Sequence, residues 1–164
     1  MTQSPITYIV EPMQGGHRYF VTMRFRYSGG KLVFAIPTWI PGSYTRRDFS
    51  KHISKLSLYS VDGNSFALSM LNLSRWQVHL PAKTQDYELT YEVYARDKSV
   101  RGCYLDHERG IFNPCCACLY IEQEIQRVHI LEFNLQQKHQ HWEVSGAQVV
   151  VQKMVLIYLM IIII

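Results

Sequence analysis

Residues 17–27 read HRYFVTMRFRY, and this stretch decides the fold class of the chain. Its tyrosine, valine, methionine and phenylalanine side chains recur at every second position, with arginine and threonine between them. Successive side chains of a β-strand point to opposite faces of a sheet, so this alternation predicts a half-buried strand. Residues 86–95, DYELTYEVYA, repeat the pattern. We expect eight side chains of these two strands in the core: Tyr19, Val21, Met23, Phe25, Tyr87, Leu89, Tyr91 and Val93.

Shorter runs rich in β-forming residues lie between turn signals, among them the Asp62-Gly63-Asn64 turn of a hairpin. A short helical segment is expected only around residues 47–55, because no segment keeps a helical period for twelve residues. About nine strands in one domain predict an all-β fold, an antiparallel β-sandwich. The shorter predicted strands are residues 6–10, 31–36, 55–61, 65–71, 75–80, 115–122 and 127–135.

Two stretches interrupt the strands and are predicted to be loops. Residues 37–48, PTWIPGSYTRRD, contain two prolines and a glycine, and residues 101–113, RGCYLDHERGIFN, mix charged and aromatic side chains. Loops on a rigid sandwich commonly carry function, so both are candidate functional segments. The alternative is that Trp39 and Tyr44 simply anchor their loop on the core.

Composition and charge exclude several classes of protein. The 164 residues are 48% hydrophobic, which is too apolar for a disordered chain. The net charge of +4 comes from dispersed residues, and the pair Arg46-Arg47 is followed at once by Asp48, so no basic block of the nucleic-acid-binding type exists. The first residues lack the basic and apolar regions of a signal peptide, which predicts a cytoplasmic location.

The cysteines and histidines form no recognisable catalytic or metal motif. Three of the four cysteines fall within four residues, a spacing that suits neither disulfides nor a zinc site, so we expect core residues on a strand. The seven histidines include no H-E-x-x-H; His139 and His141 are predicted to be surface residues rather than metal ligands. The chain alone does not look like a complete enzyme. The cysteines are Cys103, Cys115, Cys116 and Cys118.

Two stretches in order resemble the glycyl aminopeptidase family of zinc metallopeptidases. PTWIPGSYTRRDFSKHI, residues 37–53, is similar to the family's Trp-Ile-Pro-Gly-Ser-Tyr loop and the Arg-Asp-Phe segment after it. YEVYARDKSVRGCYLDHERGIFN, residues 91–113, is similar to a second family stretch, and the opening ITYIVEP also fits. The resemblance covers roughly residues 5–143. One departure is Pro114-Cys115-Cys116, where the family tends to have Gly-Thr.

The resemblance implies the family's N-terminal β-domain, similar to the saddle-like domain that precedes the catalytic domain in aminopeptidase N relatives. The H-E-x-x-H helix, the zinc and a later PDZ-like domain would lie downstream, so no cofactor and no hydrolysis are expected of this chain alone. Its partners would be the missing catalytic domain of the same polypeptide and a peptide substrate, with no nucleic acid and no membrane. Candidate substrate or interface residues are Tyr44, Arg46, Arg47, Asp48, Arg101 and Asn113.

Alternatives remain open at this point. Asp48 could instead neutralise an arginine within its own loop. The chain could be a free-standing β-sandwich binding module, or a small protein anchored to a membrane by its apolar tail.

The last residues differ in character from the rest, which divides the chain into a β-domain, residues 1–143, and an apolar tail, residues 144–164. The apolar run after Lys153 is eleven residues long, against about 20 needed to cross a bilayer. We predict that the sequence from about Lys153 onward is a reading-frame artefact without a defined packing site. With freely chosen synonymous codons, a shifted frame gives a soluble Asn-Gly-Phe-containing string that resembles the family's continuation.

Overall fold

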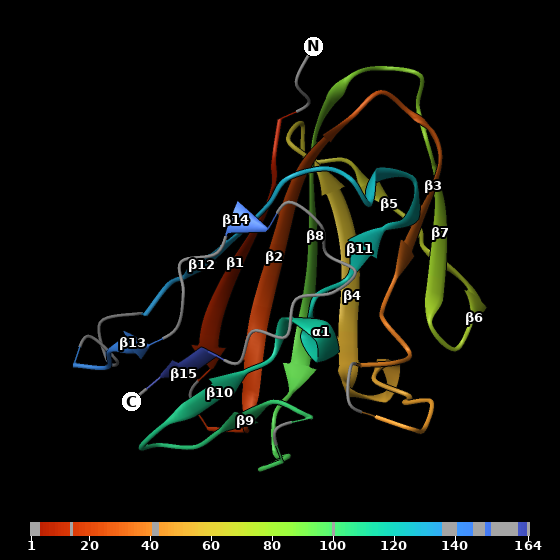
Figure 1. Ribbon diagram of the computed structural model, residues 1–164. Helices are drawn as coiled ribbons and strands as arrows, with labels where there is room; N and C mark the ends of the chain where they lie inside the picture. Colours follow the sequence, from red (N-terminus) through yellow and green to blue (C-terminus); the bar gives the residue numbers. More distant parts are fainter. Residues whose placement is uncertain are drawn as a thin grey trace.

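The computed structural model describes residues 4–13, 15–40, 43–99, 101–135, 141–145, 150–151 and 161–163. Strands dominate them, and they form three sheets (Figure 1). The predicted all-β, sandwich-like fold is therefore confirmed.

The largest sheet has seven strands, and its centre is the pair predicted from the alternating sequences. β2 (Arg18–Tyr27) and β8 (Gln85–Tyr94) pair antiparallel over all ten residues. The other neighbouring strands also pair antiparallel, except β1 and β12, which pair parallel. This one parallel pair differs from the predicted antiparallel sandwich. The sheet order is β14 (Val150–Val151), β12 (His129–Phe133), β1 (Ile6–Met13), β2, β8, β4 (Ile53–Ser60) and β5 (Ser65–Phe66).

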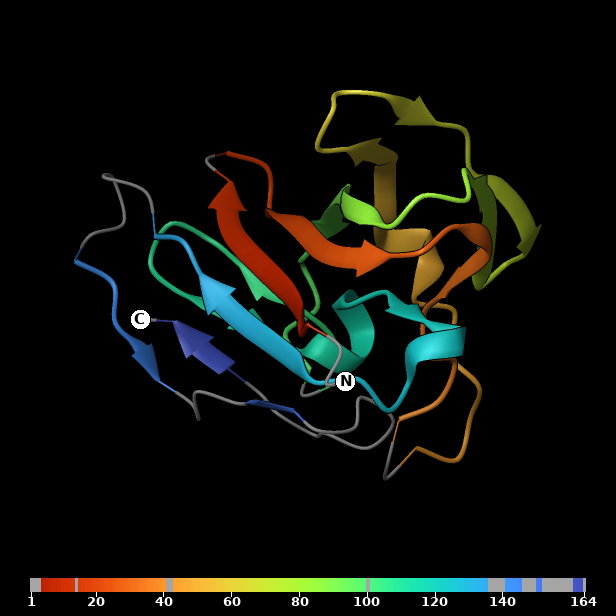
Figure 2. The same cartoon turned by 90° about the horizontal axis from the view of Figure 1, so that it is seen from above.

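A second sheet packs against the inner face of the first. Phe25 of β2 meets Phe34 of β3 edge to face, with ring centroids 5.6 Å apart, and joins the two layers. Figure 2 shows the two layers from above, with the second sheet at the right. The strands of the second sheet, in order, are β11 (Tyr120–Ile121), β3 (Gly30–Ala35), β7 (Arg75–Leu80) and β6 (Ser69–Asn72).

A third, smaller sheet lies across one end of the large sheet, at the bottom of Figure 1. Its β10 supplies Phe112, which meets Tyr19 of β2 edge to face at 5.1 Å. Its strands, in order, are β13 (Val144–Ser145), β15 (Ile161–Ile163), β10 (Gly110–Phe112) and β9 (Tyr104–Leu105).

The core lies between these layers and contains all eight side chains predicted from the alternation. Each of them is at most 3% exposed. Burying a large apolar side chain contributes roughly 1.5–3 kcal/mol, so the two alternating strands supply much of the driving force for folding.

Three predicted elements differ in the structure. Residues 65–71 form two strands rather than one, because β5 pairs with β4 in the large sheet while β6 pairs with β7 in the second sheet. Residues 101–113 are a loop only in part, since β9 and β10 form a hairpin within them. The predicted strand at 115–122 is confirmed only for β11 and is wrong for the rest, where the chain forms α1 (Pro114–Ala117) before β11 and the 3-10 helix η2 (Glu122–Glu124) after it.

The short helical segment expected around residues 47–55 is confirmed as the 3-10 helix η1 (Ser50–His52). The expectation that it would be the only helical segment is wrong, because α1 and η2 are helical too.

The apolar tail is described only in part. The backbone of Val150–Val151 pairs with β12, and Ile161–Ile163 lies between β10 and β13. Only the pairing of Ile161–Ile163 falls after Lys153, and it differs from the expectation that the sequence there has no defined packing site. Residues 146–149, 152–160 and 164 lie outside the described residues, and the reading-frame artefact stays a prediction. Among the residues that the structure describes, no helix is long and apolar enough to cross a membrane.

Candidate functional site

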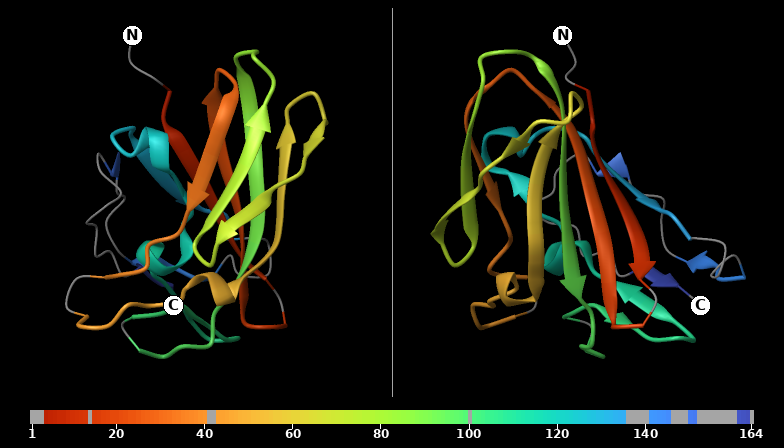
Figure 3. Two further views of the ribbon diagram at one scale, coloured as in Figure 1. Left: turned by 90° about the vertical axis from the view of Figure 1, so that its right-hand side faces the viewer. Right: turned by 180° about the vertical axis from the view of Figure 1, so that it is seen from behind.

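The two predicted functional segments lie at the same end of the sandwich, which we call the loop end (residues 37–52 and 95–113). The register pairs Arg18 with Tyr94 and Ile53 with Val93, so β2 and β4 begin where β8 ends. η1 precedes β4 directly, and residues 95–113 follow β8. Figure 3 shows both segments at the bottom of the molecule.

The short helix α1 lies next to the second segment. The thiol of Cys116 in α1 donates to the carbonyl oxygen of Arg101 at 3.0 Å. Burial raises the pKa of that thiol, and the positive charge of Arg47 works in the opposite direction. Both segments lie at the same end of the sandwich, as expected, and their contact with a catalytic domain stays a prediction.

The first segment is held by its own polar contacts and two buried side chains. The Arg47 amide donates to the Thr38 carbonyl at 2.7 Å, and the Arg47 guanidinium donates to the hydroxyl of Ser43 at 3.3 Å. Ile40 and Phe49 fasten the segment to the core, at 0% and 6% exposure.

The exposed aromatics of this segment are not the anchors that one alternative proposed. Tyr44 is fully exposed and Trp39 is 53% exposed, although the indole Nε1–H of Trp39 donates to the Ser43 carbonyl at 2.7 Å. Both rings are therefore available to a partner.

Asp48 does not neutralise an arginine in this structure. Its carboxylate accepts a hydrogen bond from the Ser50 hydroxyl at 2.6 Å, and no ion pair joins it to a basic side chain among the described residues. Arg46 is exposed, and Arg47 is half-buried. Among the described residues, the guanidinium groups of Arg46 and Arg47 therefore have no carboxylate partner.

The second segment contains one exposed and one buried candidate. Arg101 is exposed. Asn113 is only 2% exposed, and its side-chain oxygen accepts from the Cys115 amide at 3.1 Å, so it caps α1. Its backbone amide donates to the Cys103 sulfur at 3.3 Å. Asn113 therefore shapes the loop end from inside.

A buried carboxylate lies next to the loop end on the outer face of the large sheet. Glu92 is 3% exposed and pairs with Lys55 at 2.7 Å and with Arg18 at 3.3 Å. Lys55 has a left-handed backbone, φ 55°, at the bulge between Ser54 and Ser57. Such a backbone is uncommon outside glycine, and here it aims the ammonium at Glu92.

Sequence reasoning missed this group, although Arg18 and Glu92 lie near the ends of the two predicted alternating strands and Lys55 begins the predicted strand at 55–61.

The four cysteines are free thiols, as expected. Cys103, Cys116 and Cys118 are buried, and Cys115 is half-buried. Burial raises the pKa of Cys103 to about 12, despite a hydrogen bond from the Asn113 backbone that works in the opposite direction. A thiol is nucleophilic only as the thiolate, so burial makes Cys103 a poor nucleophile. The burial of the cysteines fits the predicted core role, on a helical turn and neighbouring loops rather than on a strand.

No metal centre forms within the part of the chain that the structure describes, where no three histidine, cysteine, aspartate or glutamate side chains gather. His141 is exposed, and His139 lies outside the described residues. Catalytic zinc needs three protein ligands and an open position for water, so the described residues do not fit that group.

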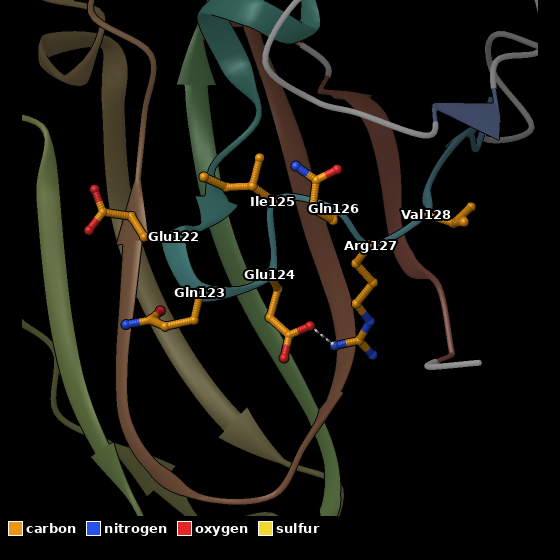
Figure 4. A pocket seen from close by; sticks show the side chains of 7 residues that line it. All are labelled: Glu122, Gln123, Glu124, Ile125, Gln126, Arg127 and Val128. Atoms are coloured by element: carbon orange, nitrogen blue, oxygen red, sulfur yellow. Dashed lines mark ion pairs between the residues drawn. The ribbon is translucent and has the colours of Figure 1, made fainter. Parts of the chain in front are cut away.

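A separate hollow of about 430 Å³ lies over the connection from β11 to β12 (Figure 4). Its charges are satisfied within the fold: Glu124 pairs with Arg127 at 3.7 Å, and Glu122 pairs with Arg75 at 2.5 Å. The Arg127 guanidinium also donates to the Arg26 carbonyl at 3.0 Å and fastens the N-terminal residues. We therefore infer that the residues around this hollow stabilise the fold and do not form a binding site. It is lined by Glu122, Gln123, Glu124, Ile125, Gln126, Arg127 and Val128.

Comparisons with known proteins agree with this architecture. The family model of the Peptidase M61 N-terminal domain matches residues 8–154. Among solved structures, the crystal structure of an aminopeptidase N family protein from Idiomarina loihiensis is similar, with a TM-score of 0.87 and 30% sequence identity. The similarity covers 96% of this chain and 29% of that chain. No curated protein matches.

Proposed function

Because the chain belongs to the family of Peptidase M61 N-terminal domains, we propose that it serves as the non-catalytic N-terminal part of a glycyl-aminopeptidase-like zinc peptidase. In the intact enzyme it would support the active-site cleft and form part of its wall. The main support is the extent of the structural match, in which nearly all of this chain corresponds to only 29% of the similar aminopeptidase N family protein. The catalytic part, with its zinc and its peptide substrate, would then lie in the remaining length.

The isolated chain tests the non-catalytic role directly. We expect no hydrolysis of glycyl-p-nitroanilide and no stoichiometric zinc by mass spectrometry after dialysis, with a full-length relative as the positive control. Catalysis needs a zinc-bound water, and the described residues offer no ligand set for it. One tightly bound zinc per chain, or turnover above the blank, would contradict the proposal.

We place the contact with the catalytic part at the loop end. The residues that resemble the glycyl aminopeptidase family gather there, and Trp39 and Tyr44 are exposed without covering the domain's own core. Aromatic and arginine side chains are enriched at the centres of protein interfaces.

An intact enzyme, formed by joining this domain to the catalytic part of its own polypeptide, tests that placement. Arg46→Ala or Arg101→Ala should lower kcat/KM or the melting temperature, whereas Lys31→Ala, on an exposed basic residue at the opposite end, should change neither. If both variants kept the wild-type kcat/KM and the wild-type melting temperature, the loop end would not be the contact with the catalytic part.

The apolar tail belongs to the same proposal. We propose that a shifted reading frame ends the family-like sequence at about Lys153 and separates the domain from its catalytic part. Sequencing the gene decides this: the shifted frame should continue into a stretch that encodes H-E-x-x-H. A free-standing binding module or a membrane-anchored protein would have no metallopeptidase frame there.

A further inference from the structure

Basic side chains on the outer face of the large sheet are paired with acids. Arg24 pairs with Glu88 at 2.7 Å, and Arg26 pairs with Asp86 at 3.1 Å. Arg18 and Lys55 share Glu92. This face therefore carries little free charge and has its ionic contacts within the domain.

The loop end is different. Among the described residues, eight basic side chains make no ion pair, and seven of them belong to the loop end. Lys31 at the opposite end is the eighth. Four acidic residues accompany the seven, so the loop end carries +3 of the chain's net +4. The seven are Arg46, Arg47, Lys51, Arg96, Lys98, Arg101 and Arg109.

The acids of the loop end are engaged with neutral donors or a histidine rather than with these cations. The Asp97 carboxylate accepts from the Ser99 amide at 2.9 Å. Asp106 accepts from the Tyr104 hydroxyl at 2.8 Å and from two backbone amides. Among the described residues, the Glu108 carboxylate forms its one ion pair with His107, at 3.6 Å. The positive charge is therefore not cancelled by close contacts inside the surface.

Exposed aromatic rings share this surface. Of the four exposed aromatic side chains in the described part of the chain, Trp39, Tyr44 and Tyr94 are at the loop end or on the strand residue that leads into it. Tyr94 stacks on His52 of η1, with centroids 6.2 Å apart. Aromatic rings beside arginines are the composition of protein-binding surfaces, in which rings supply buried area and arginines bind carboxylates.

We propose that the loop end is a docking surface for a carboxylate-rich protein segment. This proposal rests on the proposed function, and the segment would belong to the catalytic part of the peptidase. A protein partner fits better than a nucleic acid, because Asp48 and Asp97 alternate with the cations along the chain and would repel successive phosphates. Carboxylates on a folded surface can instead be placed opposite individual cations.

The isolated chain allows a direct test with a synthetic acidic peptide, hexaglutamate, at low salt. Trp39 is a suitable reporter because Trp76 and Trp142 are buried. We expect saturable quenching or a spectral shift that weakens with added salt, and no response to hexalysine. Arg46→Gln/Arg101→Gln should weaken binding about tenfold, since two charge-assisted contacts are lost.

A charge-matched control separates specific docking from net charge. Lys31→Gln/Lys83→Gln also removes two positive charges, from exposed residues at the opposite end, and should leave the affinity within about twofold. Equal weakening in both double variants, no binding of hexaglutamate, or tighter binding of a single-stranded DNA hexamer would each overturn the inference. Loss of activity in the intact Arg46→Ala enzyme would still support the proposed function after such a result, so the two failures can be told apart.

Discussion

Lowering the pH from 7.5 to 5.0 should destabilise the domain through one buried histidine, His129. Its ring is 3% exposed and stacks on Tyr8 at 5.8 Å. Tyr8 donates its hydroxyl proton to the Leu119 carbonyl at 2.7 Å and faces His129 Nδ1 at 3.2 Å, so we assign the ring proton to Nδ1. Nε2 is then an unprotonated nitrogen, in agreement with its lack of a partner among the described residues.

The environment disfavours the charged ring. Burial, and to a smaller extent the nearby positive charge of Arg127, together lower the pKa of His129 from 6.5 to about 4. The unfolded chain takes up a proton near its ordinary pKa of 6.5, whereas the folded chain stays neutral. The contribution is therefore complete above pH 6.5 and is lost as the pH falls from 6.5 toward 4.

Linkage gives the size of the loss. Each unit of pKa difference corresponds to about 1.36 kcal/mol, so His129 should remove about 2 kcal/mol of unfolding free energy between pH 7.5 and 5.0. The total below pH 4 would approach about 3.4 kcal/mol, a large share of the roughly 5–15 kcal/mol that stabilises a typical domain.

Urea unfolding of the wild type and of His129→Gln at both pH values measures this term. We expect the wild type to lose about 2 kcal/mol more than the variant between pH 7.5 and 5.0. The other ionisable groups are the same in both proteins, so their contributions cancel in the difference. Equal losses in the two proteins would refute the reasoning, whatever the variant costs at pH 7.5.

Three further predictions concern packing, capping and thiol access. Gly110→Ala should lower the unfolding free energy by about 1–3 kcal/mol, because the added methyl group would overlap the Tyr19 hydroxyl. Adding Tyr19→Phe should recover part of that loss, and strictly additive melting data would contradict this. Asn113→Ala should lower the unfolding free energy by about 1 kcal/mol through loss of the α1 cap, and an unchanged urea midpoint would count against it. In the native protein a thiol reagent at pH 8 should modify Cys115 first, since the other three thiols are buried, and Cys115→Ser should abolish that first phase; modification of Cys103 at the same rate would show that the loop end opens.

The alternating strands could be predicted from the sequence because the period of two is a property of the strand itself. Every second residue from Tyr19 to Phe25 and from Tyr87 to Val93 is buried, as the pattern requires. The loops could be located for a similar reason, because proline and glycine act locally. The family resemblance added the N-terminal position in a peptidase, which no periodicity contains.

The remaining features depend on contacts that local patterns do not encode. The β-forming residues at 115–122 favour a strand when taken alone, whereas Asn113 and Pro114 before them favour the start of a helix, which is what forms. The division of residues 65–71 depends on which sheet each half meets. The excess positive charge of the loop end cannot be found by counting charged residues along the sequence, because the structure is needed to show which cations have an acidic partner.

The parallel pairing of β1 with β12 has a consequence for synthesis on the ribosome. Ile6 pairs with His129, and the Arg127 guanidinium bonds to the hydroxyl of Ser4 at 3.1 Å, so the first strand finds its second neighbour more than 120 residues later. At about 5–20 residues per second, the nascent chain exposes one edge of β1 for roughly 6–25 s. A loop of this length also makes the β1–β12 pairing slow to form. In the interval between the synthesis of β1 and that of β12, one edge of β1 is therefore open to chaperones, proteases and wrong partners.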